Sequence, residues 1–196
     1  MAQVADKVKL SFKALKEPRV DAKAFSTHEL EFEYTPRITQ SIEVQYSQFE
    51  LQHTNYQPSA FGSRKVPTIG ISGPFVSRTE EEGRKTLNAI HLLRTATMMY
   101  YGRGEKEPRR GTPPPIGRLN AYGLYNNTPV VVSSFQYDYP QDVDYISVKM
   151  ADGVQTVPVL FDINISLLVQ FTPIEVVSDF TLGDFASGKL LGKGYI

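Results

Sequence analysis

The side chains that could carry out chemistry in this sequence are few and scattered. There is no cysteine, and the histidines number three, His28, His53 and His91. None of them stands at metal-ligand spacing from another or beside a plausible nucleophile. His91 lies in a segment with helical spacing, where a packed or solvent-facing imidazole is far commoner than a catalytic one. We therefore expect no metal centre, no thiol chemistry and no histidine-activated nucleophile.

An acidic cluster is the best candidate for binding a hard cation. Residues 138–144 (DYPQDVD) place Asp138, Asp142 and Asp144 around a proline. Calcium takes about six to eight oxygen ligands and usually a glycine for the tight loop. Three carboxylates around a proline fall short of that set, so solvation at a strand edge is the preferred interpretation.

Motifs for nucleophilic or phosphate chemistry are absent from the sequence. There is no Gly-x-Ser-x-Gly elbow, no phosphate-binding loop and no dinucleotide fingerprint. The glycine pairs at Gly70/Gly73 and Gly102/Gly104 lack the further glycine and the strand-to-helix context of such loops. Nothing ties two carboxylates to a cleft. We expect that the protein is not an enzyme and needs no cofactor.

Composition indicates a globular domain. The 196 residues suffice for one domain with a sizeable core, or one domain with an arm, and 41% hydrophobic with 21% charged residues exclude wholesale disorder. Equal numbers of basic and acidic residues, 21 each, argue against a nucleic-acid-binding domain or a polybasic membrane anchor. No stretch approaches the roughly 18–20 apolar residues of a membrane helix. The N-terminal residues lack a signal-peptide core, so we expect no leader and no membrane partner.

Alternating residues near the C-terminus give the strongest structural signal. Side chains on a strand point to opposite faces in turn, so apolar residues at every odd position from Val157 to Phe171 predict one unbroken strand. At about 3.4 Å per residue it would reach roughly 50 Å, which suits a strand that curves round a barrel or extends beyond it. The predicted apolar face comprises Val157, Val159, Phe161, Ile163, Ile165, Leu167, Val169 and Phe171.

Two shorter alternations carry opposite charges. Apolar residues occupy the even positions of residues 7–13 and 29–34, while the odd positions are mostly lysine in the first and all glutamate in the second. Such strands could pair within one subunit or between subunits, at a few tenths to about 1 kcal/mol per cross-strand contact, or they could be solvated faces of unrelated strands. The candidate assembly residues on them are Lys7, Lys9, Lys13, Glu29, Glu31 and Glu33.

The remaining elements are a helix, a further strand and two hairpins. Thr79 and the three glutamates that follow form a capping box, and helical spacing continues towards Gly102, which predicts a helix at about 79–101. Residues 41–52 predict a core-facing strand with a bulge near Ser47. Hairpin turns are predicted at Asn126-Asn127 and at residues 151–153.

Together these elements predict a mainly β protein. We expect an antiparallel β-barrel or sandwich with one α-helix packed on one side. The predicted organisation is a charged N-terminal β arm at 1–40, a barrel domain with the helix at 41–173, and a C-terminal docking tail at 174–196.

The order of several segments between Ile69 and Thr172 is distinctive. It runs IGISG (69–73), the capped helix with AIHLLRTATMMYYG (89–102), GTPPP (111–115), YGLY (122–125), PVVVSSF (129–135), YPQDVDY (139–145) and the long alternating segment. This order resembles the tube-fold proteins of bacteriophage tails, and most closely the baseplate tube-initiator proteins of contractile-tailed phages.

The resemblance implies a structural protein of the virion, assembled in the bacterial host cytoplasm. Six copies would form a ring, each contributing strands to a continuous barrel with its helix outside. The ring would join the tail tube to the baseplate and continue the DNA conduit. The implied partners are further copies of the chain, the tail tube protein, other baseplate proteins and a tape measure protein, with DNA passing transiently and without specific binding.

Two alternatives stay open at this point. The repeated tail tube subunit, or the inner tube of a contractile injection system, would share the fold. A small β-barrel that holds a ligand in its mouth belongs to another class. A ring former should assemble through main-chain strand contacts, whereas a ligand barrel should stay monomeric with a well-formed pocket.

The acidic strand leads to a first prediction. Replacing Glu29, Glu31 and Glu33 together by lysine should impair assembly more than folding, because opposite charges across strands would become like charges. Light scattering would report assembly and circular dichroism would report folding. Unchanged ring formation by the triple variant would count against a role of the charged strands in assembly.

Overall fold

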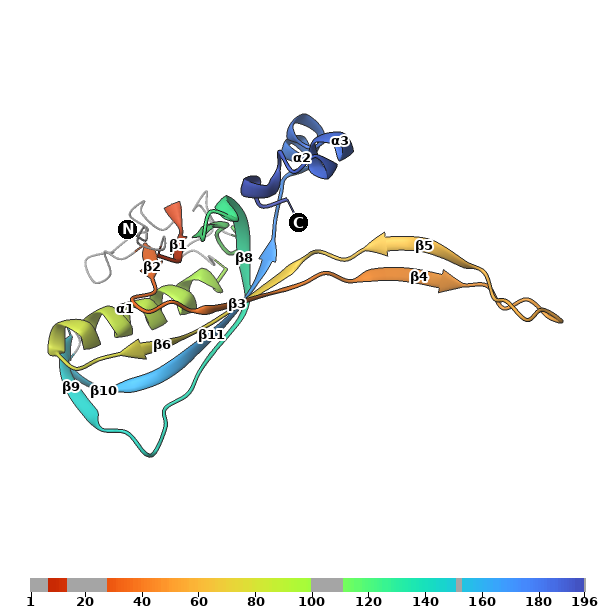
Figure 1. Ribbon diagram of the computed structural model, residues 1–196. Coiled ribbons are helices and arrows are strands. Elements are labelled where there is room, and N and C mark those ends of the chain that lie inside the picture. Colours follow the sequence, from red (N-terminus) through yellow and green to blue (C-terminus); the bar gives the residue numbers. More distant parts are fainter. Residues whose placement is uncertain (1–6, 14–27, 100–110, 151–152, 196) are drawn as a thin grey trace, which may run out of the picture.

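The computed structural model describes residues 7–13, 28–99, 111–150 and 153–195. Within these ranges the protein is mainly β, with one seven-stranded antiparallel sheet, two sheets of two strands each and few helices (Figure 1). This confirms the predicted fold class. None of the helices in the described ranges is both long and apolar enough to cross a bilayer.

The large sheet places its C-terminal strand, β11, in the interior of the strand order and not at an edge. Strand β11 pairs on one side with β6 and on the other with β8, both antiparallel. The strand order is β2-β1-β7-β8-β11-β6-β3. The strands are β1 (Lys9–Ser11), β2 (Glu29–Glu31), β3 (Arg37–Ser41), β6 (Thr68–Val76), β7 (Gly117–Ala121), β8 (Tyr125–Tyr137) and β11 (Leu160–Val169).

The two edge strands of this sheet, β2 and β3, are consecutive in the chain. Residues 32–36 join them, so the ends that face each other, at Glu31 and Arg37, lie at most about 20 Å apart. A flat sheet of seven strands spaced about 4.8 Å apart would separate its edges by roughly 29 Å. The sheet must therefore curl, and Phe32 in the connection is buried in the interior that it encloses.

Side chains tie the connection to the far part of the sheet. The Tyr122 hydroxyl donates to the Pro36 carbonyl at 3.0 Å, and the Tyr125 hydroxyl bonds Gln40 Oε1 at 2.9 Å. Gly73 of β6 lies so near the connection that an added Cβ would stand 2.9 Å from the ring of Pro36. These contacts hold the β7–β8 turn, the connection and β6 together.

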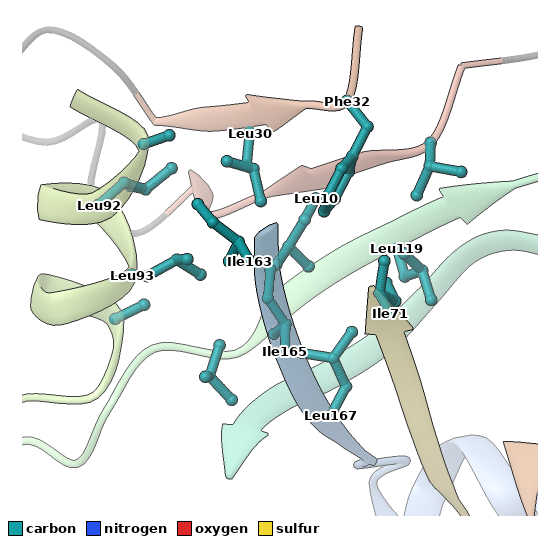
Figure 2. Packing of buried hydrophobic residues seen from close by; sticks show 14 of the residues in the cluster. Leu10, Leu30, Phe32, Ile71, Leu92, Leu93, Leu119, Ile163, Ile165 and Leu167 are labelled. Carbon is teal, nitrogen blue, oxygen red and sulfur yellow. The ribbon is translucent and has the colours of Figure 1, made fainter. Parts of the chain in front are cut away.

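Helix α1 (Glu80–Ala96) spans the rolled sheet from one edge region to the other. It packs against β9 (Tyr145–Met150) and also contacts β2, β6 and β8. Figure 2 shows side chains of the helix meeting those of the sheet in the core. The labelled core residues are Leu10, Leu30, Phe32, Ile71, Leu92, Leu93, Leu119, Ile163, Ile165 and Leu167, each at most 3% exposed.

The helix begins where predicted and ends earlier. The Thr79 hydroxyl accepts from the Glu82 N–H at 3.2 Å, and the Glu82 carboxylate accepts from the Thr79 N–H at 3.2 Å, which is the expected capping box. The helix ends at Ala96 because the next N–H groups bond three residues back instead of four, the Thr97 N–H to the Arg94 carbonyl among them. Residues 100–101 of the predicted helix lie outside the described residues.

The expectation of one unbroken strand over Val157–Phe171 is wrong. Strand β10 (Gly153–Pro158) pairs only with β9 in a two-stranded sheet, and β11 begins in the large sheet at Leu160. At the bend, the Val159 N–H donates to the Asp144 carbonyl and its own carbonyl accepts from the Ser77 N–H, both at 2.8 Å.

The predicted apolar face survives the bend. Val157 and Phe161, on either side of it, are both buried, and Val159 between them is half-buried. Because the bend keeps the two strands in phase, the period-two pattern runs through it without interruption. The alternation of apolar residues therefore predicted the buried face correctly but gave no sign of the break between β10 and β11.

Both predicted hairpins are present, but one of the two turns lies at other residues than predicted. Strands β9 and β10 form the expected hairpin, and its turn at 151–152 lies outside the described residues. The β7–β8 turn is at Tyr122-Gly123, where both residues have positive φ, and not at Asn126-Asn127, which belongs to β8. Glycine suits such a turn because it has no Cβ to clash.

Residues 7–13 and 28–40, which belong to the predicted N-terminal β arm, contribute to the large sheet. Val8, Leu10 and Phe12 from the first range are buried, as are Leu30 and Phe32 from the second. The proposed domain boundaries themselves stay a prediction.

A different segment projects from the sheet as a long hairpin (Figure 1). Strands β4 (Val44–Gln48) and β5 (Ser59–Arg64) pair only with each other, and every residue from 42 to 66 is exposed. We call residues 42–66 the arm. The expectation that 41–52 faces the core is wrong, and the register shift lies between Gln45 and Tyr46 instead of near Ser47.

The chain finishes in a small helical segment, residues 173–195, which we call the C-terminal unit. It contains α2 (Pro173–Asp179), α3 (Leu182–Ala186) and the 3-10 turn η2 (Leu191–Lys193). The Tyr195 ring stacks on Phe171 with centroids 4.4 Å apart, and its hydroxyl donates to the Glu175 carbonyl. Gly194 has a φ of 72° and lies directly against Thr128 of β8, where no side chain would fit.

Close packing at Gly83 of α1 gives a stability prediction. A Cβ there would lie 2.6 Å from Val148 Cγ2 and 3.2 Å from Ile146 Cδ1 and Val157 Cγ1. Gly83→Ala should therefore separate the helix from the β9–β10 hairpin and destabilise the fold by about 1–3 kcal/mol, measured by urea unfolding. Gly183→Ala in α3 is the control, because its Cβ meets nothing within 4 Å. Equal urea midpoints for the two variants would contradict the packing.

Candidate assembly surfaces

The predicted basic and acidic strands pair with each other within one chain. Lys9 stands opposite Glu31 in the β1–β2 ladder, and the buried Leu10 stands opposite Leu30. The Lys7 and Lys9 ammonium groups reach the two Glu31 carboxylate oxygens at 2.8 and 3.1 Å. Of the alternatives left open by the sequence, the structure shows pairing inside the subunit.

Glu31 is the electrostatic centre of this pair of strands. Hydrogen bonds from Lys7 and then Lys9 hold the pKa of Glu31 below its ordinary value, and the bond to Glu31 raises the pKa of Lys7. These side chains are about half exposed, so water and salt screen the attraction. The cluster fixes the register of the edge strand more than it stabilises the fold.

The acidic side chains of β2 border a groove at the edge of the sheet. The groove encloses about 310 Å³ between β2, β6 and α1, and Glu29, Glu31 and Glu33 line it together with Lys85 and Phe75. Lys13 lies beyond the end of β1 and is exposed. A role of these charged residues in contacts between subunits stays a prediction.

The eight odd-numbered residues predicted to serve assembly mostly lie inside the chain. Val157, Phe161, Ile163, Ile165, Leu167 and Val169 are buried in the core, while Val159 and Phe171 are half-buried. Strand β11 has a neighbour on each side, so its main chain presents no free edge along the paired residues. The structure gives these side chains a role in the core, and a role in assembly stays a prediction.

The arm is ordered by its own contacts. Tyr46 and Phe61 meet edge to face across the two strands, with centroids 6.1 Å apart. Beyond the strands, the Phe49 N–H donates to the Pro58 carbonyl at 3.0 Å, and the Gln57 amide bonds both the N–H and the carbonyl of Leu51. At the base, Lys65 and Glu43 form an ion pair at 2.7 Å.

The arm displays large apolar side chains to solvent from base to tip. Tyr56 is 87% exposed and Phe61 is 64% exposed. Exposed apolar surface of this kind marks interaction sites, and a lone two-stranded hairpin is marginally stable in water. The exposed set comprises Ile42, Val44, Tyr46, Phe49, Leu51, Tyr56, Phe61 and Val66. The arm is therefore the strongest candidate for a surface that a partner covers.

Sequence reasoning missed the arm because its first strand has the pattern of a core strand. The second strand carried a usable signal: β5 reads SAFGSR and contains one large apolar residue. A strand buried on a core face would carry more of them. A patterned strand followed by a polar partner is thus a sign of an exposed hairpin.

A second groove, which we call the base groove, lies between the base of the arm and the C-terminal unit. It encloses about 420 Å³. Ile42 and Arg64 contribute from the arm, and Leu124 from the β7–β8 turn. The C-terminal unit adds Phe185, Leu191 and Tyr195, so most of the lining is apolar.

The candidate chemical groups of the sequence do not converge in the described residues. No three histidine or acidic side chains there stand close enough to hold a metal, and Asp138, Asp142 and Asp144 form no such group. His53 lies in the arm with a φ of 60°. Burial and the positive charge of Arg94 lower the pKa of His91, which suits a neutral imidazole packed in the helix.

Comparison with known proteins gives little. No protein-family model matches the chain, and no curated protein matches it significantly. Among solved structures, a chain from the tail of an empty GTA particle with C6 symmetry aligns at 9% identity, over 87% of this chain and 96% of that one, with a TM-score of 0.35.

The charged cluster gives a pH-dependent prediction for Glu31→Gln. Because the pKa of Glu31 is lowered in the folded chain, its contribution to stability is present above the ordinary value of 4.5 and is lost as pH falls through the folded value. We expect the variant to melt lower at neutral pH, by no more than about 2 °C, and the difference to vanish once the pH has fallen below the lowered pKa of Glu31. Thermal unfolding across this range measures it, with Glu81→Gln as the control. A difference in melting temperature that persists in acid would contradict a stabilising role of the ionised Glu31 carboxylate.

Proposed function

We propose that the chain is a structural protein of a phage-type tail, that it assembles with copies of itself, and that it is not an enzyme. The observation that carries the proposal is the arm, an ordered hairpin that exposes aromatic and aliphatic residues along its length. Burial of one such side chain is worth roughly 1.5–3 kcal/mol relative to exposure. The isolated chain gains only part of this, because these side chains stay largely exposed, so the arm is accounted for by a partner that covers it.

A ring is the natural result of such an arm. The contact between an arm and a different surface of the next copy is head-to-tail, and head-to-tail contacts close into rings when their rotation permits. The resemblance of residues 69–172 implies strands of a barrel with the helix packed outside, and the rolled sheet with α1 on one side is compatible with that arrangement. We infer six copies from that resemblance.

The finer role follows from the same resemblance. The ring would join the tail tube to the baseplate within the virion and continue the DNA conduit. Its partners would be the tail tube protein, other baseplate proteins and a tape measure protein. Zero net charge supports a conduit, because each phosphate contact would add salt-sensitive affinity and slow the passage of DNA. A repeated tube subunit would use the same contacts in stacked rings.

The ligand-binding barrel receives less support. The interior of the rolled sheet is filled by core side chains such as Phe12, Phe32 and Ile163. The two grooves described above lie at the surface and are bordered by exposed residues.

The cross-strand aromatic pair of the arm provides the test. Tyr46→Ser with Phe61→Ser should leave the large sheet intact, since both side chains are more than half exposed, contact each other across the arm and are not part of the core. We expect the unchanged chain to give rings of about six copies in light scattering and negative-stain images, and the double variant to stay monomeric with an unchanged circular dichroism spectrum.

The control is Val154→Ser, at a residue that is 65% exposed on β10 away from the arm. It should assemble as the unchanged chain does. Rings formed equally well by the double variant, or an unchanged chain that stays monomeric up to its solubility limit, would overturn the proposal.

A further inference from the structure

The base groove and the tip of the arm both expose apolar side chains to solvent. The groove is lined mainly by apolar residues that are exposed, Leu191 at 66% and Leu124 at 41% among them. The tip, residues 49–57, exposes Phe49 at 53% and Leu51 at 54%. Both surfaces would gain from burial, and they are similar in character.

The arm of a chain is unable to fill its own base groove. Ile42 and Arg64 at the base of the arm form part of the groove wall. The tip begins several residues further out, and from Ile42 to Leu51 an extended chain covers about 30 Å. The hairpin points away from the C-terminal unit (Figure 1). The tip of the arm therefore does not occupy the groove of its own chain, whereas the tip of a second copy is free to enter it.

Charge supports this pairing. Arg64 in the groove and Glu50 in the tip are both exposed, and neither makes an ion pair within the described residues. Their neighbours differ in this respect, because Glu43 and Lys65 pair with each other in the same chain. One cation is therefore available at the groove and one anion at the tip.

We propose that the base groove receives the arm tip of a second copy, with Glu50 of the incoming tip bound to Arg64. The inference rests on the proposed self-assembly and names the receiving surface. In this contact Phe49 and Leu51 pack against the apolar residues of the C-terminal unit, while Glu50 meets Arg64 at the base of the arm. Each copy gives its tip to one neighbour and receives the tip of a different neighbour, which makes the contact head-to-tail.

Charge reversal tests the contact directly. Glu50→Arg alone and Arg64→Glu alone should each raise the concentration for half-assembly at least about fivefold at low salt, and less at high salt. The variant with both changes should assemble nearly as the unchanged chain does, because the opposite charges are restored. Glu43→Arg is the control, since its partner lies in its own chain. A double variant that assembles no better than the single ones would overturn the proposal.

Disulfide trapping gives an independent readout without background, because the chain has no cysteine. Leu51→Cys combined with Leu191→Cys should give a ladder of cross-linked oligomers on oxidation. Leu51→Cys combined with Val154→Cys should give none beyond dimers. Absence of the ladder in a preparation that forms rings would overturn the groove assignment.

The two proposals can fail separately. If the Tyr46/Phe61 double variant loses assembly while the charge reversals and the cysteine pair have no effect, the arm serves assembly through another surface. If the unchanged chain does not assemble, both proposals fail.

Discussion

The short connection between β2 and β3 is the constraint on which the fold depends. Because residues 32–36 join the two edges of a seven-stranded sheet, the sheet has to roll up, and rolling creates the interior that the apolar faces fill. Helix α1 contacts β2 at one edge and β6 beside the other, so it covers the remaining opening. The Lys7/Lys9/Glu31 cluster and the bond from Tyr122 to Pro36 hold the ends of this connection in register.

A rolled sheet that is complete in itself explains why the arm is free to project. The core takes its apolar residues from β1, β2, the strands β6 to β11 and α1, and the arm supplies none of them. The exposed aromatic residues of the arm therefore do not contribute to the hydrophobic core. The C-terminal unit likewise contributes little to the core beyond Leu190, yet it leaves Ile174 and Val177 at least 80% exposed. These two projections carry most of the surface suited to assembly.

Sequence periodicity predicted which side chains share a face of a strand, but not what packs against that face. The capping box located the start of α1, and the odd positions from Val157 did face the core. The bend at Val159 could not be predicted because the alternation of apolar residues continues through it. The first strand of the arm was predicted to face the core because an apolar alternation does not show whether another element covers the strand. The closure of the sheet depends on pairings between segments far apart in the chain, which no local pattern encodes. For the same reason, the base groove, formed by three separate segments, could not be predicted.

Hydrogen exchange measured by mass spectrometry on the unchanged chain, at concentrations below and above the onset of assembly, tests arm-mediated assembly most directly. Amides of the arm and of residues 185–195 should exchange more slowly in the concentrated sample, while those of β6, β8 and β11 should exchange alike in both. Arm amides that exchange equally at both concentrations would contradict arm-mediated assembly.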